Sequence, residues 1–176
     1  MELTQKRLKE RVNYNPDTGI FTWKARLLNE FKSEINMNKF NSQLLDNPVG
    51  TKKNDGYLIL LIDGKSYRLH RLAWLYVYGV MPDSDIDHIN SVRDDNRICN
   101  LRQATRSENM QNLKKAMINN KSSGLLGVSY DKKLQKFYSR IGIKGKRKYL
   151  GFFKTPEEAH AAYLNAKREL HLFSTL

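Results

Sequence analysis

Cysteine is almost absent from this sequence, and long apolar runs do not occur. A single cysteine, Cys99, stands among 176 residues, which excludes an internal disulfide framework and any zinc site built from several thiolates. We expect Cys99 to be a small buried apolar residue. Because no stretch of about 18 apolar residues occurs, the sequence predicts no membrane span. Residues 1–6 lack the apolar core of a signal peptide, which predicts a cytoplasmic protein.

Acidic residues are also in deficit. Lys and Arg number 31 against 18 Asp and Glu, so the formal net charge is +13 at pH 7. Most of this excess lies in residues 116–176, which form only the last third of the chain. A positive charge concentrated in one region is typical of proteins that bind nucleic acid. A solvated basic surface without a partner is the alternative.

The first part of the chain has turn signals between short apolar stretches. Residues 11–24 predict a β-hairpin around a turn rich in Asn, Pro and Gly. Residues 26–48 are polar and weakly patterned, which predicts a long irregular segment. Residues 49–70 predict further strands, with a tight turn at Asp63-Gly64. The apolar stretch from Leu72 to Tyr78 predicts a short helix, because a glycine follows it directly.

The second part of the chain has clear helix starts. Thr105 and Glu108 form a capping box after a short predicted strand at 101–104, so a helix is expected to carry Asn109. The polar stretch 119–124 predicts a linker and a domain boundary.

The residues after this linker predict three strands and one helix. The strands are expected at 126–130, 136–144 and 146–153. Thr155 as N-cap and Pro156 at the first helical position predict a helix. Its apolar residues fall on one stripe, which we expect to pack against the strands.

A carboxylate and an imidazole stand side by side at Asp87 and His88. Phosphodiester hydrolysis needs a deprotonated water, relief of transition-state charge and help for the leaving oxygen, and a divalent ion supplies the last two. Oxygen atoms of Asp87 and Asn109 suit one Mg²⁺ or Mn²⁺ ion, and a nearby histidine can accept the proton of the water. On an extended segment, the two neighbouring side chains point to opposite faces. One centre can therefore use both only where the strand ends or twists, or where the phosphate bridges them.

Four short motifs resemble the His-Asn-His (HNH) motif of phage and intron-encoded homing endonucleases. They are Asp87-His88-Ile89-Asn90, Asp95-Asn96-Arg97, Asn100-Leu101-Arg102 and Glu108-Asn109. In that family a two-stranded hairpin and a helix clamp one metal ion. The resemblance implies that His88 is the general base and that Asp87 and Asn109 bind the metal. It also implies that Asn100 ties the intervening loop and orients the base.

Some roles around this motif stay open. Asn109 stands where many members of the family have histidine, and an amide oxygen favours Mg²⁺ or Mn²⁺ over zinc. Asn112, one helical turn later, could share or take over that role. His70 could assist at the metal or play a structural, hydrogen-bonding part. Arg102 is one of several arginines that could grip a DNA phosphate.

Residues 124–174 are similar to the APETALA-type (ethylene-response-factor) DNA-binding domain of plants. The similarity rests on Gly127-Val128, residues 137–141, Leu150-Gly151-Phe152-Phe153, and Thr155-Pro156-Glu157-Glu158-Ala159 with Ala161-Ala162-Tyr163. That family lays a three-stranded sheet in the major groove and packs a helix behind it. The resemblance and strand alternation together place these side chains on the DNA face: Lys133, Tyr138, Arg140, Arg147 and Tyr149.

Together these features predict an α+β protein with a ββα-metal (HNH) nuclease module and a three-stranded antiparallel sheet packed on one helix. The expected domains are a strand-rich accessory segment 1–50, a nuclease 51–118 and a DNA-binding domain 119–176. The expected activity is cleavage of double-stranded DNA with one Mg²⁺ or Mn²⁺ ion, without a small-molecule cofactor, in a bacterial host if a phage encodes it. The rivals are a DNA-binding regulator with a decayed nuclease module and an RNA-binding protein. The oligomeric state is open.

Overall fold

The computed structural model describes residues 2–113, 116, 120, 122–143, 145–171 and 174. The chain divides into two compact units, residues 1–103 and residues 104–176. This division does not coincide with the boundaries expected after residues 50 and 118. Residues 118 and 119, at the second of these boundaries, lie outside the described part of the chain.

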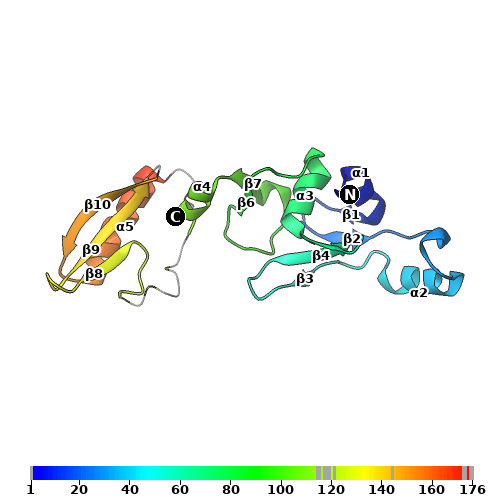
Figure 1. Ribbon diagram of the computed structural model, residues 1–176, viewed down its shortest axis with the longest axis horizontal. Helices are drawn as coiled ribbons and strands as arrows, with labels where there is room; N and C mark the ends of the chain where they lie inside the picture. The colour runs from blue at the N-terminus through cyan, green and yellow to red at the C-terminus, as the bar shows by residue number, and fades with distance from the viewer. Residues whose placement is uncertain are drawn as a thin grey trace. The chain divides into compact units, whose positions relative to one another are not determined.

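The first unit consists of short elements (Figure 1). In chain order they are α1 (Gln5–Arg11), β1 (Val12–Tyr14), β2 (Phe21–Trp23), η1 (Leu28–Glu30), α2 (Glu34–Leu44), β3 (Thr51–Lys52), β4 (Leu58–Ile62), β5 (Lys65–Arg68), α3 (Leu69–Tyr78), β6 (Asp85–His88), η2 (Ile98–Asn100) and β7 (Leu101–Ala104). They form three small sheets: β1 with β2, β3 with β4 and β5, and β6 with β7. The β1–β2 and β3–β4–β5 pairings are antiparallel.

One hydrophobic core unites this first unit. Leu8 and Phe21, from the segment expected to be accessory, are fully buried in the same cluster as Leu72 and Leu75 of α3. Ile86 of β6, beside the predicted catalytic pair, is buried in that cluster too. The segment 1–50 therefore shares its core with the strand that carries Asp87 and His88.

The structure changes the expected boundary between the strands at 49–70 and the helix that follows. The strand predicted to reach His70 ends at Arg68, and α3 begins at Leu69 rather than Leu72. The reason is that Leu69, Leu72 and Leu75 face the core at helical spacing. His70 is consequently a buried helix residue. Gly79 ends α3 with φ of 83°, as predicted.

The prediction of an irregular segment at 26–48 is wrong. Residues 34–44 form α2, whose N-cap Ser33 accepts a hydrogen bond from Asn36 N. Arg26 anchors the helix: its backbone N–H and carbonyl pair with the side-chain amide of Asn41, and its guanidinium stacks on Phe40. Because α2 contains no buried residue, its sequence lacks the apolar periodicity that would have marked it as a helix.

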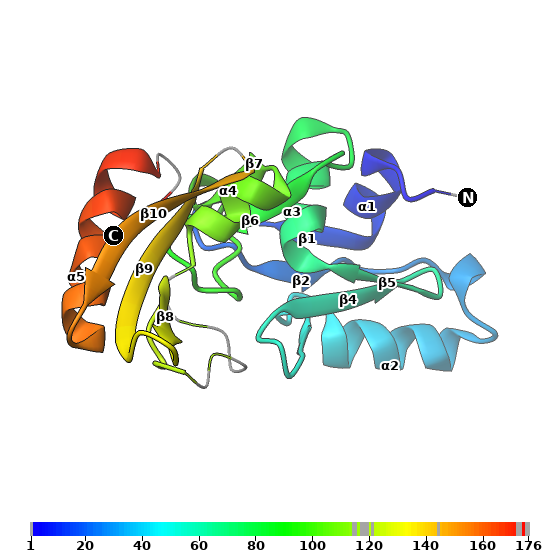
Figure 2. The same ribbon diagram turned by 60° about the vertical axis from the view of Figure 1, so that its left-hand side comes forward.

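The second unit contains α4 (Arg106–Gln111), β8 (Val128–Asp131), β9 (Lys136–Ile143), β10 (Lys146–Phe153) and α5 (Pro156–Leu170). The strands form an antiparallel sheet in the order β10-β9-β8. Figure 2 shows α5 along one face of this sheet. Ile141 of β9 packs there with Tyr163 and Ala166 of α5. Both predicted helix starts are confirmed, each with a complete capping box.

No helix in the described part of the chain combines the length and apolar character needed to cross a membrane.

Candidate active site

Strand β6 positions the two side chains that the sequence singled out. Asp87 and His88 are both buried, and β6 ends at His88. The carbonyl of His88 then accepts a hydrogen bond from Ser91 N at 2.8 Å, so the chain turns directly after the histidine. One centre can use both neighbouring side chains where the strand ends, and β6 ends at this pair.

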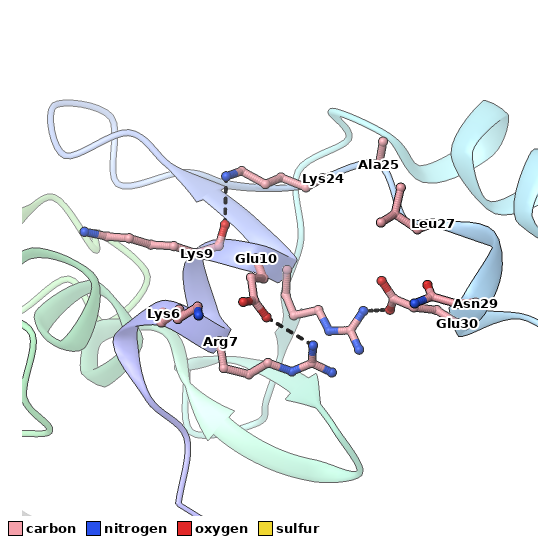
Figure 3. A pocket seen from close by; sticks show the side chains of 10 residues that line it. Lys6, Arg7, Lys9, Glu10, Lys24, Ala25, Leu27, Asn29 and Glu30 are labelled. Carbon is pink, nitrogen blue, oxygen red and sulfur yellow. Dashed lines mark hydrogen bonds and ion pairs between the residues drawn. The ribbon is translucent and has the colours of Figure 1, made fainter.

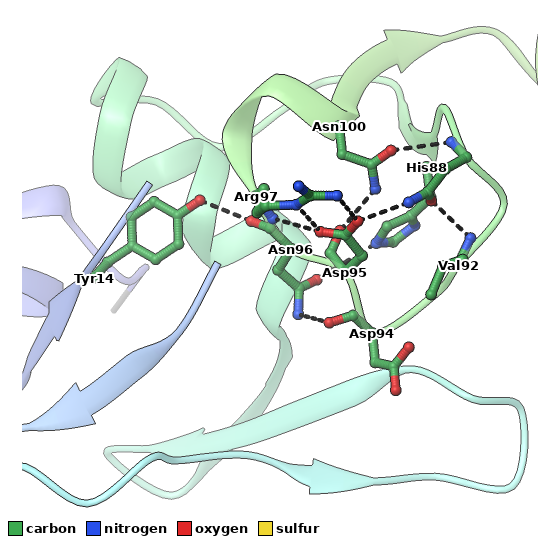
Figure 4. Close-up of polar contacts among 9 residues, drawn as sticks. Tyr14, His88, Val92, Asp94, Asp95, Asn96, Arg97 and Asn100 are labelled. Atoms are coloured by element: carbon green, nitrogen blue, oxygen red, sulfur yellow. Dashed lines mark hydrogen bonds and ion pairs between the residues drawn. The ribbon is translucent and has the colours of Figure 1, made fainter. Parts of the chain in front are cut away.

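Asn100 closes the loop that follows β6 (Figure 4). Its Oδ1 accepts from Asn90 N at 3.0 Å, and its Nδ2 donates to the carbonyl of Asp95 at 2.8 Å. Ile89 N donates to the Asn100 carbonyl at 2.9 Å. These contacts tie the loop at both ends, which is the structural role implied for Asn100. Its part in orienting the base stays a prediction.

Asp95 organises the interior of the same loop. Its carboxylate accepts from Asn90 Nδ2 at 2.7 Å and from Arg97 Nε and Nη2 at 2.8 and 2.6 Å. The hydrogen bonds from Arg97 lower the pKa of Asp95 to about 2. Asp95 and Arg97 therefore hold the loop. Cys99, in η2, is exposed, so the prediction that it is buried is wrong: the turn presents it to solvent while Asn100 points inward.

Asn96 contacts His88, a role that the sequence did not reveal. Its Oδ1 lies 3.4 Å from His88 Nε2, and the side chain is almost fully buried. Asn96 Nδ2 donates to the Asp94 carbonyl at 3.2 Å, which leaves Oδ1 to face the imidazole. Asn96 therefore positions the imidazole through Nε2. The only sequence signal for this contact is the Asp95-Asn96-Arg97 motif, and the motif does not show which of its side chains contacts the histidine.

Asn96 is itself held by the first hairpin. Tyr14 Oη donates to the Asn96 carbonyl at 2.7 Å, as Figure 4 shows. Ile98 N donates to the Pro16 carbonyl at 3.1 Å. The β1–β2 turn thus supports the loop that faces His88, which gives the N-terminal segment a direct structural part in this site.

His88 sits in a cluster of aromatic rings. The rings of His70 and His88 meet edge to face with centroids 5.1 Å apart, and Tyr57 packs against both. Within the described residues, His70 Nδ1 is buried without a hydrogen-bond partner. The hydrogen-bonding role expected for His70 is thus absent at this nitrogen, and ring packing takes its place. Burial lowers the pKa of both histidines, for His70 to about 3.

These depressed pKa values make the first unit sensitive to acid. The unfolded chain protonates His70 below about pH 6.5, whereas the folded chain keeps it neutral down to about pH 3. Stability is therefore lost as pH falls through this window, by about 2 kcal/mol at pH 5 from His70 alone. Between pH 7 and pH 5, we expect the free energy of unfolding of His70→Phe to fall by about 2 kcal/mol less than that of the wild type.

Urea unfolding followed by tryptophan fluorescence measures this effect. Both tryptophans of the chain, Trp23 and Trp74, belong to the first unit, so the signal reports on that unit alone. His160→Asn, in the second unit, is the matched control and should leave the pH dependence unchanged. An equal acid loss in the wild type and in His70→Phe would contradict the assignment.

Asp87 is paired with Arg102. Nε and Nη2 of Arg102 donate to Asp87 Oδ2 at 3.0 and 2.8 Å. The sequence suggested Arg102 for a DNA phosphate, and the structure places it beside the predicted metal ligand. A phosphate that binds Arg102 would thereby lie close to Asp87 and His88.

The side chains described at this site fit a magnesium ion with few protein ligands, not a metal ion held by many. The described residues contain no group of three or more His, Cys, Asp or Glu side chains that could hold a metal ion. Mg²⁺ commonly takes only one or two protein carboxylates and fills its remaining positions with water and phosphate. Asp87 matches that requirement. Asn109 lies on α4 in the second unit, so its partnership with Asp87 stays a prediction, as does the alternative with Asn112.

The basic and aromatic residues predicted to contact DNA lie in or beside the sheet of the second unit. Arg140, Arg147 and Tyr149 are exposed on β9 and β10, and Tyr138 is half-buried on β9. Lys133 is exposed in the β8–β9 turn, where its N–H donates to Asp131 Oδ1 at 2.9 Å. Ser139 and Ile141, expected on the opposite face, are buried. Lys144, a basic residue whose side chain would also suit a phosphate, lies outside the described residues.

A basic pocket in the first unit contains none of the predicted site residues (Figure 3). It lies between α1 and the segment that follows β2. Three of its cations are used internally: Arg7 pairs with Glu10 within α1, Arg11 pairs with Glu30, and Lys24 Nζ donates to the Lys9 carbonyl. The last two contacts join α1 to the segment after β2, so we assign the pocket a structural role.

Comparison with known families supports the assignment of the β6–β7 region. Residues 67–111 match the family described as HNH endonuclease, so the chain carries an HNH endonuclease domain there. The matched stretch includes Asp87, His88, Asn100 and Asn109. No curated protein and no solved structure matches the chain.

Proposed function

We propose that this protein is a metal-dependent endonuclease that hydrolyses phosphodiester bonds of double-stranded DNA. The observation that carries the proposal is the buried His88 beside Asp87, at the end of β6 within the matched HNH region. An HNH endonuclease domain suggests DNA cleavage. The formal net charge of +13 suits a polyanionic substrate.

The residues of the site divide the chemistry between them. Asp87 and Asn109 would hold one Mg²⁺ or Mn²⁺ ion, which supplies charge relief and polarises the scissile phosphate when bound. His88, neutral because burial lowers its pKa, accepts the proton of the attacking water on its imidazole ring. Asn96 holds the imidazole through Nε2. Arg102, which pairs with Asp87, would bind a phosphate oxygen next to the cleaved bond.

The second unit supplies DNA binding in this proposal. Arg140 and Arg147 are exposed on neighbouring strands and reach outward from one sheet. A β-ribbon fits the major groove, and an arginine there reads guanine through two hydrogen bonds. Lys133, with its flexible charged side chain, suits a phosphate. An APETALA-type sheet that selects the site and an HNH module that cuts nearby would make the protein a homing-type nuclease.

Supercoiled plasmid DNA tests this function. Wild-type protein with Mg²⁺ or Mn²⁺ should convert it to open circles or linear molecules, and EDTA should prevent both. Open circles would identify single-strand nicking, and linear molecules would identify double-strand cleavage. Salt-sensitive duplex binding without cleavage in either metal would contradict the nuclease and favour a non-catalytic DNA-binding regulator.

A further inference from the structure

The outer face of the β8–β10 sheet carries a packed cluster of aromatic rings. The rings of Tyr138, Tyr149 and Phe152 lie with centroids 5.4 to 6.3 Å apart. Phe152 is 43% exposed and Tyr149 is 52% exposed, on the face of the sheet opposite α5. We call these three residues the aromatic patch. Exposed apolar surface of this kind usually marks a contact site.

A β-bulge in β10 builds the patch. Tyr149 pairs with Arg140 and Gly151 pairs with Ser139, so Leu150 is the extra residue. Without the bulge, Tyr149 and Phe152 would face opposite sides, because they are three residues apart in one strand. Gly151 has φ of 135°, a conformation that side-chain-bearing residues rarely adopt. The strand is therefore bent in a way that brings Phe152 onto the outer face.

Positive charge surrounds the patch. The guanidinium of Arg140 lies 5.7 Å from the centroid of the Tyr138 ring. Arg147 and Lys136, which strand alternation places on the same face, are exposed on the same two strands. An apolar centre with a cationic border complements the major groove, whose floor carries the thymine methyl groups and whose edges carry phosphates.

The packing of the rings favours methyl groups over stacked bases as the ligand. A stacking platform needs free ring faces. Here Phe152 meets Tyr138 at 73° and Tyr149 at 67°, so ring edges cover part of the neighbouring faces. With centroids no more than 6.3 Å apart, the three rings leave too little room for a base to stack between two of them.

We propose that the aromatic patch binds the C5-methyl groups of thymine in the major groove, and so directs the protein to thymine-rich duplex DNA. This inference rests on the proposed function of the sheet as the DNA-binding surface. It adds recognition of thymine methyl groups to the guanine contacts proposed for Arg140 and Arg147. Phe152, which no sequence argument had placed on this face, is the central residue.

Replacing thymine by uracil removes the methyl group and leaves all hydrogen-bonding atoms of the base pair in place. The full-length protein, in EDTA to prevent cleavage, would be titrated at one salt concentration against alternating A·T and A·U duplexes and a mixed-sequence duplex. Each buried methyl should be worth about fourfold in affinity. We expect the A·U duplex to bind roughly fifteenfold more weakly than the A·T duplex, as two contacted methyls would give.

Phe152→Asn links the effect to the patch and should reduce the difference between A·T and A·U to about the value of one methyl or less. Leu134→Asn is the matched control: Leu134 is an exposed apolar residue of the β8–β9 turn, outside the patch, and its loss should preserve the difference. Equal affinity of the wild type for A·T and A·U, with tight binding to the mixed-sequence duplex, would overturn this inference alone. Absence of binding to all three duplexes would overturn the proposed DNA-binding function with it.

Discussion

Replacement of His88 by alanine is expected to lower the rate of DNA cleavage by a factor of about 10² to 10⁴, with little change in DNA affinity. The imidazole is buried at the end of β6, and burial lowers its pKa, so it is available as a base near neutral pH. The residues proposed to bind DNA lie mainly on β9 and β10, so binding does not depend on this ring. Cleavage rates and binding curves from the same preparation measure both quantities.

Two further variants make this result specific. His88→Gln retains more of the side-chain volume between Tyr57 and His70 and should be equally inactive, which separates lost chemistry from a packing defect. His160→Gln, in the second unit, should cleave like the wild type. Cleavage by His88→Ala at the wild-type rate would remove the histidine from the mechanism.

Replacement of Gly19 by alanine is expected to destabilise the first unit by about 3 kcal/mol or more. Gly19 closes the β1–β2 turn with φ of 74° and donates to the Asn15 carbonyl. A Cβ atom at this position would lie 2.5 Å from Arg97 N and 2.7 Å from the Asn96 carbonyl carbon. These are backbone atoms of the loop that faces His88, and they cannot move without disturbing it.

Gly64→Ala is the matched control for Gly19→Ala. Gly64 has a similar φ of 78°, but no atom lies within 4 Å of its added Cβ. Gly64→Ala should therefore lose only the free energy that a side chain costs at positive φ, about 1 kcal/mol. Urea unfolding followed by the fluorescence of Trp23 and Trp74 compares the two variants. Equal losses would show that the close approach of the hairpin to the loop is not important for stability. Gly19→Ala should also reduce cleavage, whereas Gly64→Ala should not.

Local sequence patterns predicted those elements whose signals are short-range. The capping residues Thr105 and Thr155 start helices as expected. Ser139 and Ile141 are buried, as the alternation along β9 indicates. The proposed catalytic pair Asp87 and His88 stands out in the sequence because its motif is ordered and closely spaced. In each case the physical cause lies within a few neighbouring residues.

Other features depend on contacts that no local pattern encodes. Helix α2 is held by Arg26 and Asn41 rather than by an apolar stripe. The contact of Asn96 with His88 depends on Tyr14, which is 82 residues away in the chain. Phe152 reaches the outer face of its sheet only because of the bulge beside Gly151. The segment 1–50 was expected to be a separate accessory part because its packing against α3 is equally invisible in the sequence.

Hydrolysis in water labelled with a heavy oxygen isotope tests most directly the central claim that the protein cleaves DNA by attack of a water on a phosphate. Cleavage of a defined duplex with Mg²⁺ should place one heavy oxygen on the 5′ phosphate of the product and leave an unlabelled 3′ hydroxyl, as measured by mass spectrometry of the ends. This pattern means that water attacks phosphorus and the 3′ oxygen leaves. Unlabelled 5′ ends, or label on a 3′ phosphate, would contradict the account.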